Sequence, residues 1–188
     1  TPHAMIRFPL AVLLFLLMAG CDAAPRGPAA VGANPTPGAV LSGPISLTAH
    51  PDGGWLVVDS GHDRLVRYDA QGLVLATWGA FGERPGAFRR PLGVAVGPEQ
   101  RIFVADYLND RVQVFDLQGR PVAQWTKFGD GERFHGPADV ATDASGHVYV
   151  VEFYGSRVFK LNAQGDLLST WGERGHEREQ FYYPTRIA

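Results

Sequence analysis

The chain has 188 residues, an apolar fraction of 45% and a formal net charge of −2. This length allows one sizeable core, and the charge balance argues against a nucleic-acid partner, which usually requires a basic surface. The 23 glycines and 14 prolines, together with 11 Phe, 6 Tyr and 4 Trp, predict short strands and many turns, and therefore an all-β fold.

Residues 1–21 have the features of an export signal. Arg7 supplies one positive charge, an uncharged apolar run follows over residues 8–20, and small residues precede Cys21. The run is shorter than the roughly 20 apolar residues that span a bilayer comfortably. Translation is expected to start at Met5, with residues 1–4 lying upstream. A short anchor helix or a buried helix is the alternative interpretation.

Cys21 is the only cysteine, so no intramolecular disulfide can form. It follows Leu17-Met18-Ala19-Gly20, which resembles a bacterial lipobox and implies cleavage before Cys21 and acylation of its thiol. Several acyl chains would anchor the protein stably, since one chain alone holds weakly. Asp22 resembles an inner-membrane retention signal, so the resemblance places the protein on the outer, periplasmic side of the bacterial cytoplasmic membrane. An ordinary secretory signal with an incidental cysteine remains the alternative.

Residues 22–43 contain no periodic apolar face. Their prolines and glycines favour an extended, solvated chain. This segment is predicted to be a flexible tether between the lipid anchor and a folded region.

Residues 44–188 contain an internal repeat of about 47 residues. Six kinds of residue recur in register along the chain. They are Pro44, Pro91, Pro137 and Pro184; Asp59, Asp106 and Glu152; Arg64, Arg111 and Arg157; Gly72, Gly119 and Gly165; Trp78, Trp125 and Trp171; and Phe88, Phe134 and Phe181.

Each repeat contains four short strand candidates. In the second unit they are 92–96, 101–105, 111–115 and 120–125, and in the third unit 138–142, 147–151, 157–161 and 166–171. Residues 111–115 alternate between polar and apolar with the period of two that a half-buried strand requires. Four short antiparallel strands in each 40–50 residues predict the blades of a β-propeller, and such blades depend on stacking against one another.

The amino-acid sequences of the units indicate a more specific family than a β-propeller in general. The segments 91–96, 102–106, 109–116 and 117–119 closely resemble the NHL repeat, and the likeness extends over residues 44–188. The third unit departs from the pattern at Glu152 and at the turn 153–156. The resemblance implies a propeller that typically closes with six blades.

The expected blades are 44–90, 91–136 and 137–183, with 184–188 as the first strand of a fourth. Three blades would leave apolar faces and a strand edge exposed. Two explanations stay open, namely a truncated chain or protomers that complete a ring as a homo-oligomer.

Several recurring residues are predicted to be structural because an active site occurs once in a protein. The Asp106–Arg111 pair and its equivalents are expected to hold a turn by charge-assisted hydrogen bonds. The recurring tryptophans are expected to pack between blades, and the recurring glycines to permit hairpin turns with positive φ.

Residues on loops that do not repeat are better functional candidates. The loops between the second and third strands and those that join blades are expected to share one face, where mixed charges and aromatics are typical of a recognition surface. Solvated loops without function are the alternative. The candidate binding residues are His62, Asp63, Arg89, Arg90, Tyr107, Leu108, Arg133, His135, Phe153, Tyr154, Arg174 and His176.

His62, His135 and His176 are also candidate metal ligands, because three histidines can form an open zinc site. They stand at different positions in their units, and the sequence contains no recognisable catalytic motif. The leading hypothesis is a membrane-anchored binding scaffold without a cofactor, whose partner is a protein, a peptide or a cell-envelope component. The alternatives are a metal-dependent lyase or hydrolase completed by further blades, and a non-functional fragment.

Overall fold

The computed structural model describes residues 39–97 and 99–188. The expected export signal, Cys21 and the tether up to residue 38 lie outside the described residues. Within the described part, no helix combines the length and the apolar character needed to cross a bilayer.

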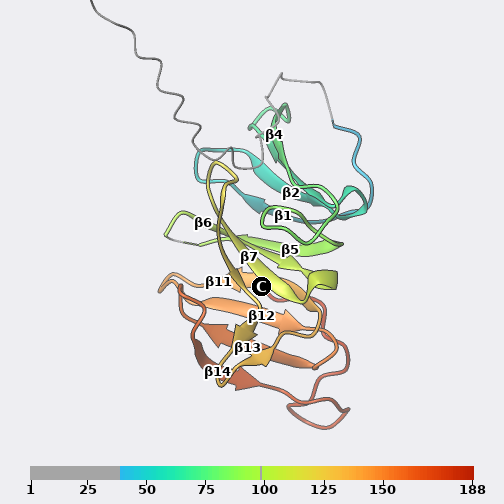
Figure 1. Ribbon diagram of the computed structural model, residues 1–188, viewed down its shortest axis with the longest axis vertical. Helices are drawn as coiled ribbons and strands as arrows, with labels where there is room; N and C mark the ends of the chain where they lie inside the picture. The colour runs from blue at the N-terminus through green and yellow to red at the C-terminus, as the bar shows by residue number, and fades with distance from the viewer. Residues whose placement is uncertain (1–38, 98) are drawn as a thin grey trace, which may run out of the picture.

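Three four-stranded antiparallel sheets follow one another along the chain, as Figure 1 shows. The first contains β1 (Pro44–Ala49), β2 (Trp55–Asp59), β3 (Arg64–Tyr68) and β4 (Val74–Trp78). The second contains β5 (Pro91–Val96), β6 (Arg101–Asp106), β7 (Arg111–Asp116) and β8 (Pro121–Trp125). The third contains β11 (Pro137–Thr142), β12 (Val148–Glu152), β13 (Arg157–Leu161) and β14 (Leu167–Trp171).

Every sheet is a meander in which each strand pairs with its neighbour in sequence. The first strands of the three sheets, β1, β5 and β11, lie next to one another, and the later strands extend outward from them. This arrangement is a β-propeller with three blades in the described part of the chain, so the predicted fold class is confirmed.

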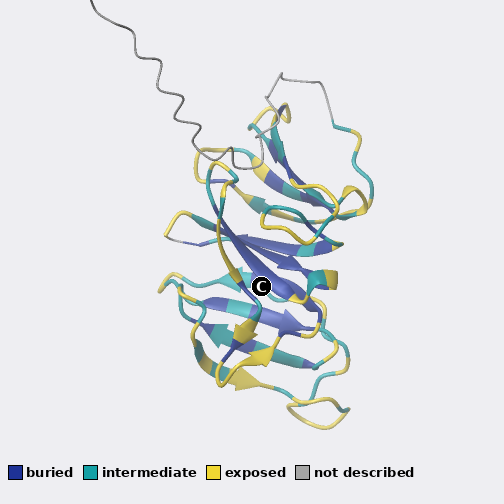
Figure 2. Cartoon of the chain, in the orientation of Figure 1, coloured by how far each residue is buried: buried dark blue, intermediate teal, exposed yellow. Residues whose placement is uncertain are grey.

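Two apolar cores lie between the blades. Both form because successive side chains of a strand point to opposite faces of its sheet. In β6, Ile102 and Val104 pack against the first blade, with Leu56 and Phe88, whereas Phe103 packs against the third. The middle blade is therefore buried on both faces, while exposed residues gather on the loops and on β14 (Figure 2). Adjacent blades stabilise one another through these shared cores.

The recurring tryptophans occupy sockets formed by the recurring glycines. A Cβ atom added at Gly119 would lie 2.2 Å from the Trp78 ring, and one added at Gly165 would lie 2.7 Å from the Trp125 ring. Both glycines also have positive φ, at 78° and 91°. The predicted roles in blade packing and turn formation are confirmed for these two pairs.

The loop 126–136 contains a hairpin that the repeat did not predict. Its strands are β9 (Lys127–Phe128) and β10 (Glu132–Arg133). The two other joining loops begin with Gly79 and Gly172, at φ 101° and 84°, and close with an isolated parallel bridge. Thr126 stands at the corresponding position, and its loop is one residue shorter, so the chain turns back on itself there.

Residues 184–188, expected as a first strand, form no strand. A strand needs a neighbour for its ladder hydrogen bonds, and the described chain offers these residues none. The segment still runs past the inner strands, where the Ile187 N–H donates to Asp139 Oδ2 over 3.1 Å.

Candidate functional site

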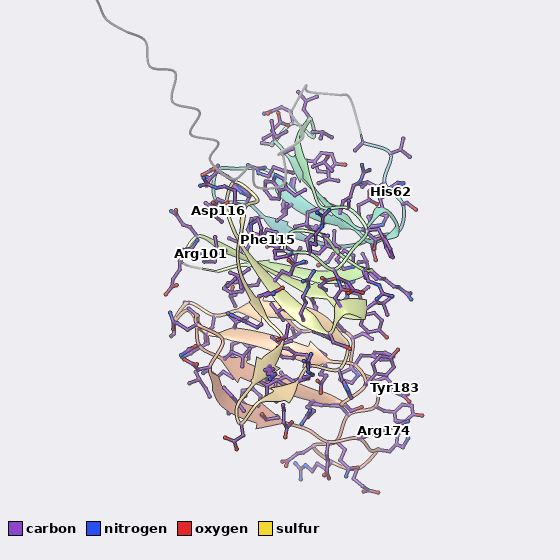
Figure 3. The ribbon with its side chains drawn as sticks, viewed as in Figure 1. His62, Arg101, Phe115, Asp116, Arg174 and Tyr183 are labelled. Carbon is purple, nitrogen blue, oxygen red and sulfur yellow. The ribbon has the colours of Figure 1, made fainter. Side chains whose placement is uncertain are left out.

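The loops between second and third strands lie on the same side of the molecule as the loops that join blades. Figure 3 places His62, Arg174 and Tyr183 on this side and Arg101 and Asp116 on the opposite one. Two of the first set are short 3₁₀ turns, η1 (Ser60–His62) and η2 (Tyr107–Asn109). We call this side the loop face.

A buried carboxylate supports each part of the loop face. Asp59, Asp106 and Glu152 end their second strands and are fully buried. Each accepts a hydrogen bond from a backbone N–H that lies 17 residues earlier in the chain, over 2.6–2.8 Å. Each also pairs with the arginine that opens the third strand, over 2.6–2.9 Å. The predicted structural role of these pairs is confirmed.

Arg111 extends this support to the joining loop 79–90. Its guanidinium donates to the carbonyl oxygens of Glu83 and Ala87, over 2.7 and 2.8 Å, besides pairing with Asp106. Asn109 Nδ2 donates to the Gly82 carbonyl over 2.9 Å. Side chains of the middle blade therefore support the loop that carries Arg89 and Arg90.

A second repeated contact joins each turn to the next blade. Asp63, Asp110 and Ser156 have left-handed backbone conformations, with φ of 50–54°. Their side-chain oxygens accept N–H groups of Arg90, Gly136 and Tyr183, over 2.6, 2.7 and 3.4 Å. Asp63 was expected to face a ligand, but its carboxylate holds the backbone of the neighbouring loop.

Equivalent carboxylates have opposite pKa shifts. Burial raises the pKa of Asp106 by more than the hydrogen bonds from Arg89, Asn109 and Arg111 lower it. Burial acts in the same direction on Asp59, but hydrogen bonds from Ser42, Arg64 and His62 outweigh it and lower the Asp59 pKa. The middle blade is covered on both faces, and this explains the stronger effect of burial on Asp106.

A continuous cluster of rings covers one part of the loop face, and we call it the aromatic arm. Tyr107 contacts both Phe153 and Tyr154, with ring centroids 6.0 and 5.8 Å apart. Phe153 stacks on Tyr183 at 4.8 Å, and Tyr183 contacts Tyr182 at 4.6 Å. These rings belong to η2, to the turn 153–156 and to the end of the third joining loop.

The aromatic arm also carries charge and has an exposed edge. Arg174 lies 4.8 Å from the Tyr183 ring centroid and donates a hydrogen bond to the Tyr183 hydroxyl over 2.5 Å. His176 stacks on Tyr182 at 4.6 Å. Tyr154 and Tyr182 are each 53% exposed. Burial and a hydrogen bond with Tyr154 raise the pKa of Tyr107 to about 12, so Tyr107 is neutral at physiological pH.

A cavity of about 380 Å³ opens beside the buried end of the aromatic arm, and we call it the mouth cavity. The residues that follow the four repeat prolines form its floor, because the repeat places them side by side. Arg90, Arg186 and two rings of the aromatic arm complete the lining. The full lining is Ile45, Arg90, Leu92, Tyr107, Ala138, Phe153, Thr185 and Arg186.

A second hollow, of about 510 Å³, adjoins the mouth cavity through Ile45 and Arg90. Phe81, which is 74% exposed, lines it together with Leu108 and Arg89. Arg89 pairs with Glu83 over 3.1 Å. A third hollow, of about 800 Å³, lies among the inner strands and shares Ile45 and Arg186 with the mouth cavity.

The structure brings some of the candidate residues together and separates others. Arg90, Tyr107 and Phe153 meet at the mouth cavity, and Tyr154, Arg174 and His176 continue along the aromatic arm. His62 binds the Asp59 carboxylate over 2.8 Å. Arg133 is exposed on β10. The backbone N–H of His135 donates a hydrogen bond to the Glu152 carboxylate. Neither contributes to the mouth cavity.

The three candidate metal ligands do not meet. His62 lies on Asp59, His176 on Tyr182, and His135 beside Glu152. Across residues 39–97 and 99–188, no three His, Cys, Asp or Glu side chains are grouped as a metal site. The alternative of a three-histidine metal site therefore finds no support in the described residues, because the histidines stand at different positions in their units.

The sequence contained a signal for residues that were missed. Tyr182 and Tyr183 precede Pro184 just as Arg89 and Arg90 precede Pro91, so the repeat aligns the two pairs. The floor of the mouth cavity is also a repeat position. Its residues went unrecognised because small and apolar side chains carry no chemical signature. The missed residues are Ile45, Phe81, Leu92, Ala138, Tyr182, Tyr183, Thr185 and Arg186.

The family model described as NHL repeat matches residues 88–115 and 134–161. These two stretches are therefore NHL repeats. The two matches begin at Phe88 and Phe134 and cover equivalent stretches of the second and third units. The first unit, which the model does not match, has the same strand order in the structure. No curated protein sequence matches the chain.

Solved structures resemble the chain in fold. Hydrazine synthase from Kuenenia stuttgartiensis matches with a TM-score of 0.57 and 17% identity, over 78% of this chain and 38% of that one. U3-55K matches with a TM-score of 0.58 and 14% identity, over 71% and 39%. Inactive virginiamycin B lyase from Staphylococcus aureus with quinupristin matches at 0.52 and 14%, over 66% and 40%. At these identities the likeness shows the fold alone.

The chain spans about two fifths of the length of these three structures. Hydrazine synthase and virginiamycin B lyase are named for different activities, so the shared fold does not indicate one chemistry.

Proposed function

We propose that the chain is a membrane-anchored, extracytoplasmic binding scaffold that recognises a protein, peptide or cell-envelope ligand through its loop face. The single observation that carries this proposal is the aromatic arm. Tyr, Phe and Arg are the residues that dominate the binding energy of interfaces, because they present large rigid surfaces with polar ends. Here seven such groups, counting His176, form one connected surface on loops that a rigid scaffold positions.

The anchor in this proposal rests on Cys21 and the preceding Leu17–Gly20. The tether 22–43 would give the propeller reach above the membrane. Replacing Cys21 by Ala in the expressed protein is expected to move it from the detergent phase to the aqueous phase on Triton X-114 partition. A protein that partitions unchanged would contradict the lipid anchor.

The binding role is testable with peptides selected from a random library on the full-length protein. Tyr154→Ala and Tyr182→Ala should each weaken the selected peptides by more than about tenfold, since interface tyrosines commonly contribute about 2 kcal/mol. Both side chains are half exposed, so their removal leaves the fold intact. Trp55→Ala is the matched control. Trp55 is 47% exposed and begins β2, whereas the loop face lies at the other end of that strand, after Asp59.

Two results would contradict the proposal. One is that no peptide is enriched on the wild-type protein. The other is that the selected peptides bind both tyrosine variants as tightly as the wild type.

A further inference from the structure

The mouth cavity has an uncommon charge distribution. Of the eight residues that line it, two are arginines and none is acidic. The remaining lining is apolar or aromatic except for Thr185. A concave site with paired cations and apolar walls favours a ligand that is both anionic and apolar.

Arg90 is positioned by its backbone and leaves its guanidinium available. Its N–H donates to Asp63, and its φ is 52°. Within the described chain, the Arg90 guanidinium makes no hydrogen bond or ion pair, unlike that of its neighbour Arg89, which pairs with Glu83. Arg90 and Tyr107 line the same cavity, and the charge of Arg90 opposes the upward pKa shift of Tyr107.

Arg186 is the second arginine that lines the cavity. It donates to the Ile45 carbonyl oxygen and lies 3.9 Å from Asp139 Oδ2. The Asp139 carboxyl accepts N–H groups from Val140 and Ile187, and burial raises its pKa. The Arg186 side chain is 51% exposed, so its guanidinium keeps donors for a ligand.

The volume and walls of the cavity set the size of the ligand. About 380 Å³ is near the lower end of small-molecule sites. Leu92 and Ala138 form an apolar floor, and the Tyr107 and Phe153 rings form one wall. These surfaces fit a short chain or a single ring.

We propose that the mouth cavity binds an organic carboxylate, with the anionic group between Arg90 and Arg186 and the apolar body against Leu92 and Phe153. This inference rests on the proposed function and names the ligand chemistry at the inner end of the aromatic arm. Arginine binds carboxylates through short charge-assisted hydrogen bonds, and apolar burial adds affinity without competing for the charge.

Three probes separate these two contributions in calorimetric titrations of the full-length protein. 4-Phenylbutyrate carries both the charge and the ring, 4-phenylbutyramide carries the ring alone, and acetate carries the charge alone. We expect 4-phenylbutyrate to bind with a Kd of roughly 1 mM, as its size allows. The amide and acetate should each bind at least about tenfold more weakly.

Two variants locate the site. Arg90→Gln and Arg186→Gln should each weaken 4-phenylbutyrate about tenfold, the size of one lost charge-assisted hydrogen bond. Arg101→Gln is the control, because Arg101 lies on the opposite side of the molecule (Figure 3) and should leave binding unchanged. Circular dichroism and the unfolding midpoint check that the variants remain folded.

The inference is overturned if the amide binds as tightly as the acid, if 4-phenylbutyrate does not bind, or if Arg101→Gln weakens it as much as Arg90→Gln. Failure here is distinguishable from failure of the proposed function. Selected peptides that still depend on Tyr154 and Tyr182 would leave the aromatic arm as a recognition surface while excluding the carboxylate site.

Discussion

One repeat position can hold chemically similar residues in different environments. Asp59 and Asp106 occupy the same place in their blades, and both are paired with an arginine at under 3 Å. Each also forms a hydrogen bond with the side chain three residues later, His62 or Asn109, but Asp106 belongs to the middle blade, which is packed on both faces. The balance between burial and hydrogen bonding therefore differs, although the local geometry does not.

This difference predicts opposite titration behaviour. By ¹³C NMR of the carboxyl carbons, Asp59 should titrate below the usual aspartate pKa of about 3.9 and Asp106 above it. The stability that Asp59 contributes is present above pH about 4 and is lost as the pH falls through its lowered pKa. For Asp106 the sign is reversed, since protonation on passing down through its raised pKa favours the folded state.

Two variants check the assignment of these effects to the two side chains. Asp59→Asn should reduce the loss of stability in acid, measured by urea unfolding at a series of pH values. Asp106→Asn should not reduce it. The same shift direction for both carboxyls would contradict the explanation from blade packing.

At the scale of strands and loops, the sequence predicted the strands well and the loops poorly. The eight strands expected in the second and third units lie within one residue of the observed bounds, because alternating apolar residues and turn glycines recur in register. The β9–β10 hairpin was missed, since it depends on Thr126 replacing a glycine and on a shorter loop. The contact of Asp63 was not foreseen for a related reason, because its partner is a backbone N–H 27 residues away.

The hairpin turns offer a matched test of the glycine sockets. Gly119→Ala should lower the free energy of unfolding by about 2–4 kcal/mol. A left-handed alanine costs about 1 kcal/mol, and overpacking against the Trp78 ring adds about 1–3 kcal/mol. Gly72→Ala is the control, because Gly72 has a similar φ of 83° but nothing within 4 Å of an added Cβ. It should cost only about 1 kcal/mol in urea unfolding.

The difference between the two alanine variants isolates the socket from the backbone cost. Equal losses at Gly119 and Gly72 would indicate that Trp78 moves aside without penalty. The tryptophan would then contribute area to the interface but not a specific fit.

At the scale of the whole molecule, the mouth cavity could not be predicted from any one segment. Its lining comes from β1, β5, β11, η2, the joining loop 79–90, the turn after β12 and the residues after Pro184. The repeat brings the floor residues together, yet the chemical character comes from Arg90, Arg186, Tyr107 and Phe153, none of which is among the six recurring kinds of residue. The sequence therefore predicted the face on which the cavity lies, and spatial stacking determined which side chains meet there.

Stacking also predicts that equivalent tryptophans differ in their contribution to stability. Trp125 ends β8 between the second and third blades and is 7% exposed, whereas Trp171 ends β14 and is 45% exposed, with Tyr149 stacked on it at 6.1 Å. Trp125→Ala should cost about 3–5 kcal/mol in urea unfolding, because it removes a buried ring and leaves a cavity. Trp171→Ala should cost about 1 kcal/mol, since its ring is only partly removed from water. Equal costs would mean that Trp171 is covered in the folded protein in solution. Trp55 is also exposed, so the exposure of Trp171 is confirmed if Trp171→Ala reduces the red-shifted emission and Trp125→Ala does not.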